Sequence, residues 1–247
     1  RVDDHPGVLR VHGAGQADGE WFIVMEHAPG GDLAARLERG PLPPAEVVRL
    51  GLALARGLAH VHARGVLHRD LKPTNVLFDE AGSPRLADFG LARLATSERL
   101  TRTGALLGTP AYMAPEQVTS AAHADARADV YGLGAVLYHA LTGRPPFMGP
   151  SALALIDRVL REPPVAPRQL VAAAPAWLEA VILRALAKDP ADRFASAAEL
   201  AAALEARRGG RSPGSRVWPF VLVTVVVAVA ALASLRGRTV ADPTPTA

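Results

Sequence analysis

Cysteine is absent from the 247 residues, which excludes disulfide bonds and thiolate metal sites and suits a reducing cytoplasm. Lysine is also scarce. Lys72 and Lys188 are the only two among 27 basic residues, so arginine accounts for the high isoelectric point. Because 24 acidic residues are interspersed with these and the net charge is only +3, no basic run resembles a nucleic-acid footprint. We therefore expect no nucleic-acid partner.

Charge is missing from one long stretch, the nineteen residues from Val217 to Leu235. At about 1.5 Å per residue, a helix of this length crosses most of a hydrocarbon core roughly 30 Å thick. Arg216 and Arg236 flank the stretch and Trp218 lies at one border, as membrane anchors do. We expect a transmembrane helix over residues 217–235, in preference to a buried helix or strand pair of a globular domain.

The arginines on the two sides of this stretch predict its orientation. Four precede it and two follow it: Arg207, Arg208, Arg211 and Arg216, then Arg236 and Arg238. Positive charge gathers on the cytoplasmic side of membrane spans, so we expect a single-pass protein of the cell membrane with its N-terminal region in the cytoplasm. Residues 207–216 would be a basic, flexible juxtamembrane linker, and residues 236–247 a short extracytoplasmic tail.

The remaining sequence predicts an α+β domain with few strands. Residues 20–27 read as a strand of a hairpin, residues 31–40 as a short helix, and residues 75–79 and 84–88 as strands around a turn. Between them a long helix is indicated, beginning at Pro43 and Pro44 and stopping at Gly65. Its apolar stripe is Val47, Leu50, Leu54, Leu58 and Val61. After residue 128 the pattern is almost wholly helical.

Three ordered motifs carry the chemistry. HRDLKPTN occupies residues 68–75, DFG residues 88–90 and APE residues 114–116. In this order and spacing they resemble the eukaryotic-like protein kinase family. Lys72, two residues after Asp70, and the stretch GTPAYMAPEQ are similar to the serine/threonine branch. A single membrane span after the domain resembles the bacterial receptor-type serine/threonine kinases.

The resemblance covers residues 1–206 and implies a protein-kinase-like fold, mostly the helical C-terminal lobe, followed by the one transmembrane helix. Residues 1–28 would be a remnant of the N-terminal lobe and hinge, and residues 29–206 the C-terminal lobe. It also implies a serine/threonine protein kinase of membrane-linked signalling, which transfers the γ-phosphate of ATP to serine or threonine hydroxyls of protein substrates.

The catalytic roles follow from the resemblance. Asp70 would accept the proton of the substrate hydroxyl, and Lys72 would neutralise charge on the transferred phosphoryl group. Asn75 and Asp88 would hold Mg²⁺, which prefers hard oxygen ligands.

The nucleotide and regulatory sites are implied in the same way. Backbone groups of Glu26 and Ala28 would bind the adenine of ATP, with Met25 as gatekeeper, Asp32 on the ribose and Leu77 as the floor of the pocket. Thr101 and Thr103 would be autophosphorylated, within a homodimer, with Arg69 as phosphate partner. An ordinary polar loop is the alternative for these two threonines. Thr109 would help to select serine or threonine substrates.

Other residues are expected to be structural. The resemblance places His68 and Phe89 in a packed spine, and Glu116 with Arg193 in a buried ion pair. It also implies that Asp129 ties the catalytic loop to a helix, in which Gly132 replaces the more usual serine at a cost in helix propensity. His60 and His62 lie two apart on a helix and point to different faces, so we expect no metal site there.

The family's glycine-rich loop, strand lysine and helix glutamate are missing from this sequence, because no lysine precedes Lys72. The glycines of residues 13–19 read as a turn between two strands. We therefore expect an N-terminally truncated kinase chain with weak or no activity. A non-catalytic kinase-like scaffold or docking module is the alternative, although intact HRD, DFG and Asn75 favour the kinase.

Overall fold

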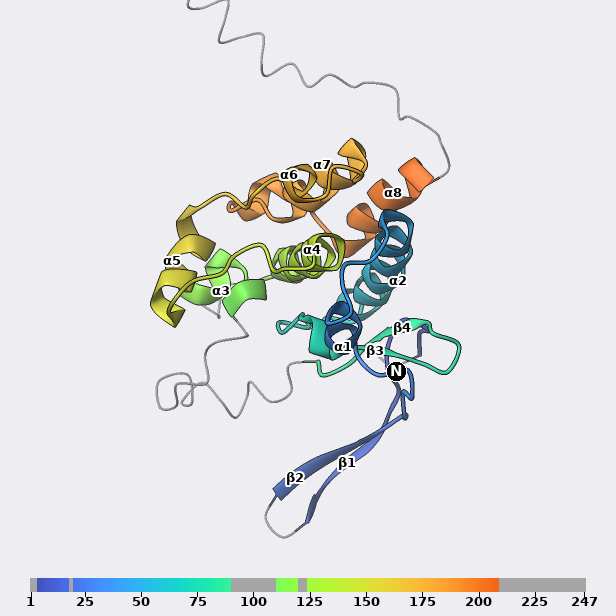
Figure 1. Ribbon diagram of the computed structural model, residues 1–247. Coiled ribbons are helices and arrows are strands. Elements are labelled where there is room, and N and C mark those ends of the chain that lie inside the picture. Colours follow the sequence, from blue (N-terminus) through green and yellow to red (C-terminus); the bar gives the residue numbers. More distant parts are fainter. Residues whose placement is uncertain (1–3, 18–19, 90–109, 120–123, 209–247) are drawn as a thin grey trace, which may run out of the picture. The chain divides into compact units, whose positions relative to one another are not determined.

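Two antiparallel helices, α2 (Pro44–His62) and α4 (Ala126–Thr142), form the centre of the computed structural model, which describes residues 4–17, 20–89, 110–119 and 124–208 (Figure 1). Helix α2 begins with Pro44, whose missing N–H costs nothing at that position. Asp125 caps α4 by accepting from the Arg127 N–H at 2.7 Å. Helix α4 ends at Gly143, which adopts a left-handed conformation at φ 77°.

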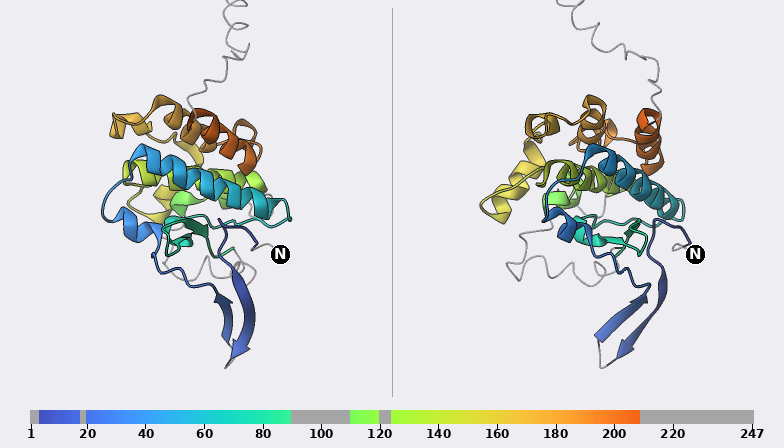
Figure 2. Two further views of the ribbon diagram at one scale, coloured as in Figure 1. Left: turned by 90° about the vertical axis from the view of Figure 1, so that its right-hand side faces the viewer. Right: turned by 45° about the vertical axis from the view of Figure 1, so that its right-hand side comes forward.

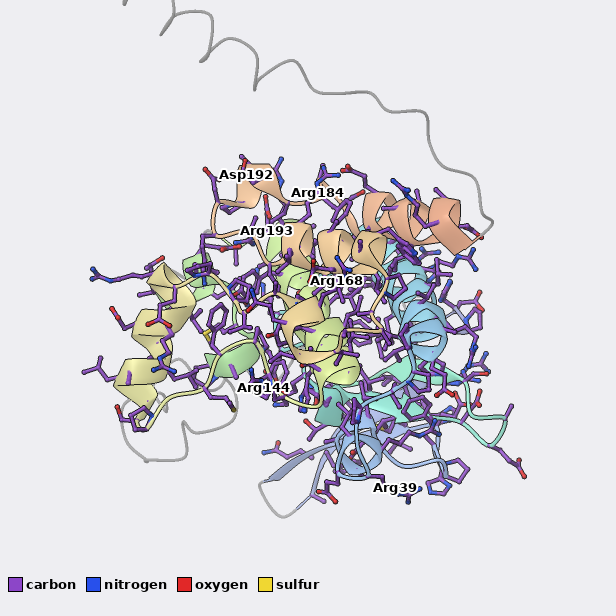
Figure 3. The ribbon with its side chains drawn as sticks, turned by 45° about the horizontal axis from the view of Figure 1, so that its top comes forward. Arg39, Arg144, Arg168, Arg184, Asp192 and Arg193 are labelled. Atoms are coloured by element: carbon purple, nitrogen blue, oxygen red, sulfur yellow. The ribbon has the colours of Figure 1, made fainter. Side chains whose placement is uncertain are left out.

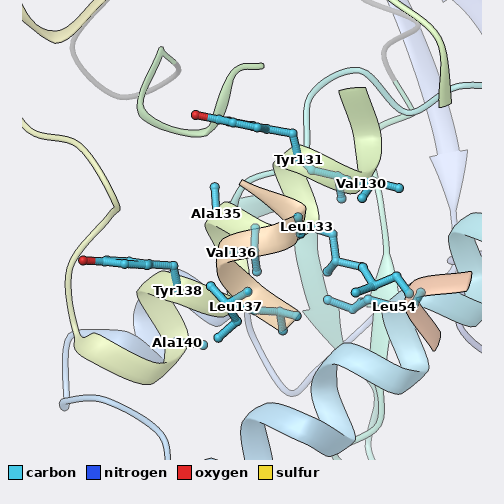
Figure 4. Packing of buried hydrophobic residues seen from close by; sticks show 14 of the residues in the cluster. Leu54, Val130, Tyr131, Leu133, Ala135, Val136, Leu137, Tyr138 and Ala140 are labelled. Carbon is cyan, nitrogen blue, oxygen red and sulfur yellow. The ribbon is translucent and has the colours of Figure 1, made fainter. Parts of the chain in front are cut away.

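The core lies where α2 and α4 meet. Leu54 of α2 and Leu133, Val136 and Leu137 of α4 are fully buried and pack together (Figure 4). Helix α4 is buried on nearly every side, as its almost uninterrupted apolar sequence requires. This confirms the long helix with an apolar stripe, which ends three residues before Gly65.

Smaller helices surround this pair. They are α1 (Leu33–Leu37), α3 (Pro115–Thr119), α5 (Ala152–Arg161), α6 (Pro167–Leu170), α7 (Ala176–Ala185) and α8 (Ala197–Arg208). Helix α8 packs along α2, and α7 packs against α4 (Figures 1 and 2). The predicted helical character after residue 128 is confirmed as far as the described residues extend. No helix of the described part is long and apolar enough to span a bilayer. The predicted membrane segment 217–235 and the tail 236–247 lie outside the described residues.

Two short strands, β3 (Val76–Phe78) and β4 (Pro84–Leu86), pair antiparallel and confirm the predicted strand pair. The N-terminal segment adds to their edge, because Leu86 donates its N–H to the Gly7 carbonyl at 2.9 Å and accepts from the Leu9 N–H at 2.8 Å. Asn75 directly precedes β3, and Asp88 follows the last residue of β4 by two positions, so this strand pair carries both expected Mg²⁺ ligands at its ends.

A hairpin of β1 (Val11–Ala17) and β2 (Glu20–Met25) projects from this body (Figures 1 and 2). The turn predicted over residues 13–19 is wrong for residues 13–17, which are strand. Gly15 faces Phe22 across the hairpin, and a Cβ on Gly15 would approach the Phe22 ring to 2.7 Å. The glycine is therefore a site of close packing by an aromatic ring within the strand pair.

Four apolar side chains of β2 are exposed, two on each face of the hairpin. Phe22 and Val24 are 47% and 49% exposed, and Ile23 and Met25 on the other face are 39% and 37% exposed. The base of the hairpin is tied to the body by the Glu26 carboxylate, which lies 3.6 Å from the Arg85 guanidinium.

A buried ion pair connects α3 to the segment before α8. Arg193 is fully buried and donates to the two carboxylate oxygens of Glu116 at 2.6 and 2.8 Å. It also donates to the carbonyls of Ala187, Lys188 and Arg127. Arg193 lies within the helical body, beside the more exposed Arg184 (Figure 3). The expected Glu116–Arg193 pair is confirmed, and its extra donors supply the hydrogen bonds that a buried charge needs.

Candidate active site

The loop that joins α2 to β3 carries the HRD motif, and a buried carboxylate fixes its backbone. Asp129 of α4 is 1% exposed and accepts from the His68 N–H at 2.8 Å and the Arg69 N–H at 2.7 Å. Arg69 adopts the left-handed conformation at φ 63°, which costs a residue with a side chain about 1–2 kcal/mol. Two charge-assisted hydrogen bonds offset that cost. The expected role of Asp129 is confirmed.

His62 is a third donor to the same carboxylate, and sequence reasoning missed it. Its Nε2 lies 2.8 Å from Asp129 Oδ2, and its side chain is largely buried. The sequence held a signal, because His62 follows Leu58 by four residues and so lies beside the apolar stripe of α2. A polar residue on a buried helix face requires a buried partner.

The three expected catalytic side chains come together at the end of this loop. The Lys72 ammonium donates to Asp70 Oδ2 at 2.7 Å. The Asn75 amide donates to the Asp70 backbone carbonyl at 2.8 Å and to Oδ2 at 3.2 Å. The carboxylate of Asp70 is therefore held by a cation and an amide, while its side chain keeps access to solvent.

Asn75 and Asp88 provide oxygen ligands that fit Mg²⁺. Two hydrogen bonds of the Asn75 side chain use its nitrogen. The amide oxygen accepts one long hydrogen bond, from the Thr74 hydroxyl at 3.4 Å, so a lone pair of this oxygen remains for a cation. The Ala87 N–H donates to the Asn75 carbonyl at 2.9 Å. The backbone of the next residue, Asp88, therefore lies close to Asn75. Asp88 is exposed at φ 55°, and no side-chain partner of its carboxylate occurs among the described residues. Hard oxygens of this kind are what Mg²⁺ binds.

The His68 and Phe89 rings pack together, as expected for spine residues. Their centroids lie 4.8 Å apart, and His68 is fully buried. Burial lowers the pKa of His68, so the imidazole is neutral at physiological pH. Its Nδ1 then accepts from the Asp70 N–H at 3.4 Å. His68 therefore acts on the loop through packing and this weak hydrogen bond.

The residues expected to bind the nucleotide lie along the segment between β2 and α1 and on β3. Asp32 caps α1, because its Oδ1 accepts from the Ala35 N–H at 2.7 Å, and its backbone pairs with Leu77. The expected ribose contact and pocket floor are thus neighbours. Glu26 and Ala28 lie between the hairpin and α1, and the Glu26 N–H is taken by the Arg10 carbonyl at 2.8 Å.

Several expected residues cannot be placed. Thr101, Thr103, Thr109 and Gly90 lie outside the described residues, whereas Arg69 lies inside them.

Gly132 was expected only to weaken its helix, but the packing around it explains why a glycine is present. A Cβ there would approach the Leu71 Cβ to 2.9 Å, so α4 and the catalytic loop pack closely at this point.

A carboxylate held by an ammonium and an amide, next to oxygen ligands for magnesium, is suited to phosphoryl transfer, in which positioning and charge do most of the work. The comparison with protein families agrees, because residues 1–203 match the protein kinase domain. The chain belongs to the protein kinase domain family.

Three related proteins are bacterial serine/threonine-protein kinases. The chain is 38% identical over 216 residues to the serine/threonine-protein kinase PknB of Mycobacterium leprae, over 85% of this chain and 35% of that protein. It is 40% identical over 200 residues to PknL of Mycobacterium tuberculosis, over 81% of this chain and 50% of that protein. With PknH of Mycobacterium bovis the identity is 41% over 199 residues, which are 80% of this chain and 33% of that protein. The chain thus spans half or less of the length of these relatives.

Replacing Asp129 by Asn should destabilise the fold by about 3 kcal/mol, because the amide nitrogen must face one of three donors, the His62 ring or the N–H of His68 or Arg69. Denaturant unfolding of the chain measures the effect. Asp192, which is exposed on the short turn before Arg193, provides the control Asp192→Asn, expected within about 0.5 kcal/mol of wild type. Equal stabilities of the two variants would contradict the role given to Asp129.

Proposed function

We propose that the protein transfers the γ-phosphate of Mg-ATP to serine or threonine hydroxyls of protein substrates. The observation that carries this proposal is the Asp70 carboxylate, which Lys72 and Asn75 hold at 2.7 and 3.2 Å. Asp70 accepts the proton of the attacking hydroxyl and orients its oxygen in line with the phosphorus. Lys72 then places positive charge where the phosphoryl group passes.

Magnesium, when bound, would supply positive charge that neutralises the phosphate oxygens. Asn75 and Asp88 are the residues that would hold it, since both present oxygen atoms at the ends of β3 and β4. The hydrogen bond from the Ala87 N–H to the Asn75 carbonyl holds the backbones of the two ligand residues close together. Asp88, at φ 55°, directly follows the residue that makes this bond.

Protein substrates fit the surface beside Lys72. A hollow of about 580 Å³ lies there, lined by Glu38, Pro73, Tyr112 and His139 among others. The Tyr112 hydroxyl and His139 Nδ1 lie 2.7 Å apart, which gives the wall a fixed polar edge. An open surface of this kind suits an extended peptide, whereas a small metabolite is usually bound in an enclosed pocket.

For residues 1–247 by themselves we propose weak Mg-ATP binding and low turnover. No lysine precedes Lys72, and four apolar side chains of β2, Phe22 to Met25, are exposed on the two faces of the hairpin. The same exposed hairpin is the observation that supports the alternative, a non-catalytic docking module, because exposed apolar surface of this kind often binds a partner protein.

The Asp70→Asn variant separates the two functions. In the full-length natural protein it should lower phosphoryl transfer to a protein substrate by about 10²–10⁴-fold, because the base is lost while size and hydrogen bonding are kept. Radiolabel transfer from ATP, compared between wild type, Asp70→Asn and the control Asp192→Asn, measures this. Equal incorporation by wild type and Asp70→Asn would refute the role of Asp70, and no incorporation by wild type would favour the docking module.

We propose in addition that Thr101 and Thr103 are autophosphorylated within a homodimer and activate the enzyme. Their T-x-T spacing between DFG and APE supports this, with Arg69 as the partner of the phosphate. Replacing both threonines by alanine should lower activity, whereas Thr119→Ala, on an exposed residue of α3, should not. Mass spectrometry of the active protein checks the modification directly, and finding both threonines unmodified would refute it.

The protein is further proposed to cross the cell membrane once, with the kinase domain in the cytoplasm, where ATP is available. The uncharged residues 217–235 and the arginine bias across them support this. A phosphatase reporter that needs export should be active when fused after Ala247 and inactive when fused before Arg1. The reverse result would contradict the orientation, and extraction of the protein by alkali would contradict the span.

A further inference from the structure

Gln117 of helix α3 has two polar contacts that the proposed mechanism does not use. The residue is buried, with 8% of its surface exposed. The amide oxygen accepts from the Ala114 N–H at 3.0 Å, and the amide nitrogen donates to the Arg69 backbone carbonyl at 3.0 Å. Exchanging the amide oxygen and nitrogen would set donor against donor and acceptor against acceptor, so these partners themselves fix the orientation of the amide.

The first contact has an ordinary explanation. Ala114 directly precedes α3 and Gln117 is the third residue of that helix, where a Gln or Glu side chain reaches back to the free N–H before the helix. Glu would serve this purpose as well, and its charge would suit the N-terminus of a helix. Capping of α3 therefore gives no reason for an amide in place of a carboxylate.

The second contact does require an amide. Only a side chain that accepts on one atom and donates on the other can satisfy both the Ala114 N–H and the Arg69 carbonyl. A carboxylate at this position would set a negative oxygen against the Arg69 carbonyl oxygen. The choice of Gln over Glu is thus explained by the catalytic loop and not by the helix.

The Arg69 carbonyl is coupled to the catalytic carboxylate through a planar group. The carbonyl of Arg69 and the N–H of Asp70 belong to one peptide unit, which is rigid. Asp129 holds the Arg69 N–H and Gln117 holds the Arg69 carbonyl, so the left-handed residue is fixed on both sides. Fixing this peptide plane fixes the point from which the Asp70 side chain departs.

We propose that Gln117 is a positioning residue, which orients the Arg69–Asp70 peptide plane and thereby aims the Asp70 carboxylate. The effect on catalysis rests on the proposed kinase function, whereas the mechanical link between α3 and the loop does not. Two variants probe the link. Gln117→Met removes both hydrogen bonds, and Gln117→Glu keeps the acceptor for Ala114 while losing the donor to Arg69. Gln169→Glu, on an exposed residue of α6, is the matched control for the change of charge.

Hydrogen exchange in the full chain tests the link without any activity. At pH about 8, both Gln117 variants should speed exchange in peptides that cover residues 67–71, and the control should not. If Gln117→Met fails to fold, Gln117→Glu alone decides, because its helix cap is intact. Exchange at the wild-type rate in Gln117→Glu would overturn the proposal, whether or not the protein proves to be a kinase.

Kinetics of the full-length natural protein test the consequence. Gln117→Glu should lower kcat about 10- to 100-fold at pH 8 and leave the KM for Mg-ATP unchanged, because it disturbs the aim of Asp70 and touches no nucleotide or metal ligand. A protonated Glu can donate to the Arg69 carbonyl, so the ratio of variant to wild-type kcat should recover as the pH falls.

The charged and titratable groups around this side chain are Arg69 and Asp70 of the loop, Asp129 of α4, Tyr112 of the preceding turn, and Glu116, which is paired with Arg193. A kcat ratio that stays at one, or that stays low at every pH, would contradict the positioning role. In a protein that shows no transfer at all, the exchange rates of residues 67–71 still support or overturn the link.

Discussion

The geometry of the site depends on one buried carboxylate. Asp129 collects three donors, the backbone N–H groups of His68 and Arg69 and the His62 ring, within 2.7–2.8 Å. A charge buried without such partners would be costly, and a loop without them would lose the left-handed turn at Arg69. Because α4 is packed on nearly all sides, the carboxylate projects from an almost completely buried helix. The position of the catalytic loop is therefore set by α4.

Strain at the site is local and balanced. Arg69 and Asp88 are the only two non-glycine residues of the described part with positive φ, and they lie on the two loops that meet at Asn75. Each is next to a backbone hydrogen bond that fixes it: the Arg69 N–H to Asp129, and the Ala87 N–H to Asn75. Unusual conformations persist where neighbouring contacts determine them fully. Here those contacts come from α4 and from Asn75, which directly precedes β3, so the core supports the conformations that the site needs.

Much of this could be predicted from the sequence, and the limits have physical reasons. The long helix and the strand pair follow from periodicity and turn residues, whereas the role of Asp129 and the Glu116–Arg193 pair follow from the resemblance to the kinase family. The roles of His62 and Gln117 were not predicted, because their partners lie 67 and 48 residues away and the resemblance assigns no partner to either residue. The predicted hairpin turn is too long, because glycines in a sequence usually indicate the end of a strand. At Gly15 it is needed for packing against Phe22, which only the register of the strands reveals.

Neighbouring side chains of α3 connect the site to the rest of the domain. Glu116 binds Arg193, before α8, while the next residue, Gln117, binds Arg69 in the catalytic loop. A helix of five residues buries too little surface to fix its own place, so these two contacts define it. Arg193 also donates to the carbonyl of Arg127 at the start of α4, the helix that carries Asp129. The loop is therefore held from two directions, by α4 directly and by α3 through Gln117, and both helices are fixed to the same buried arginine. A disturbance of Arg193 should consequently reach Asp70 along two routes, although it contacts neither substrate nor metal ligand.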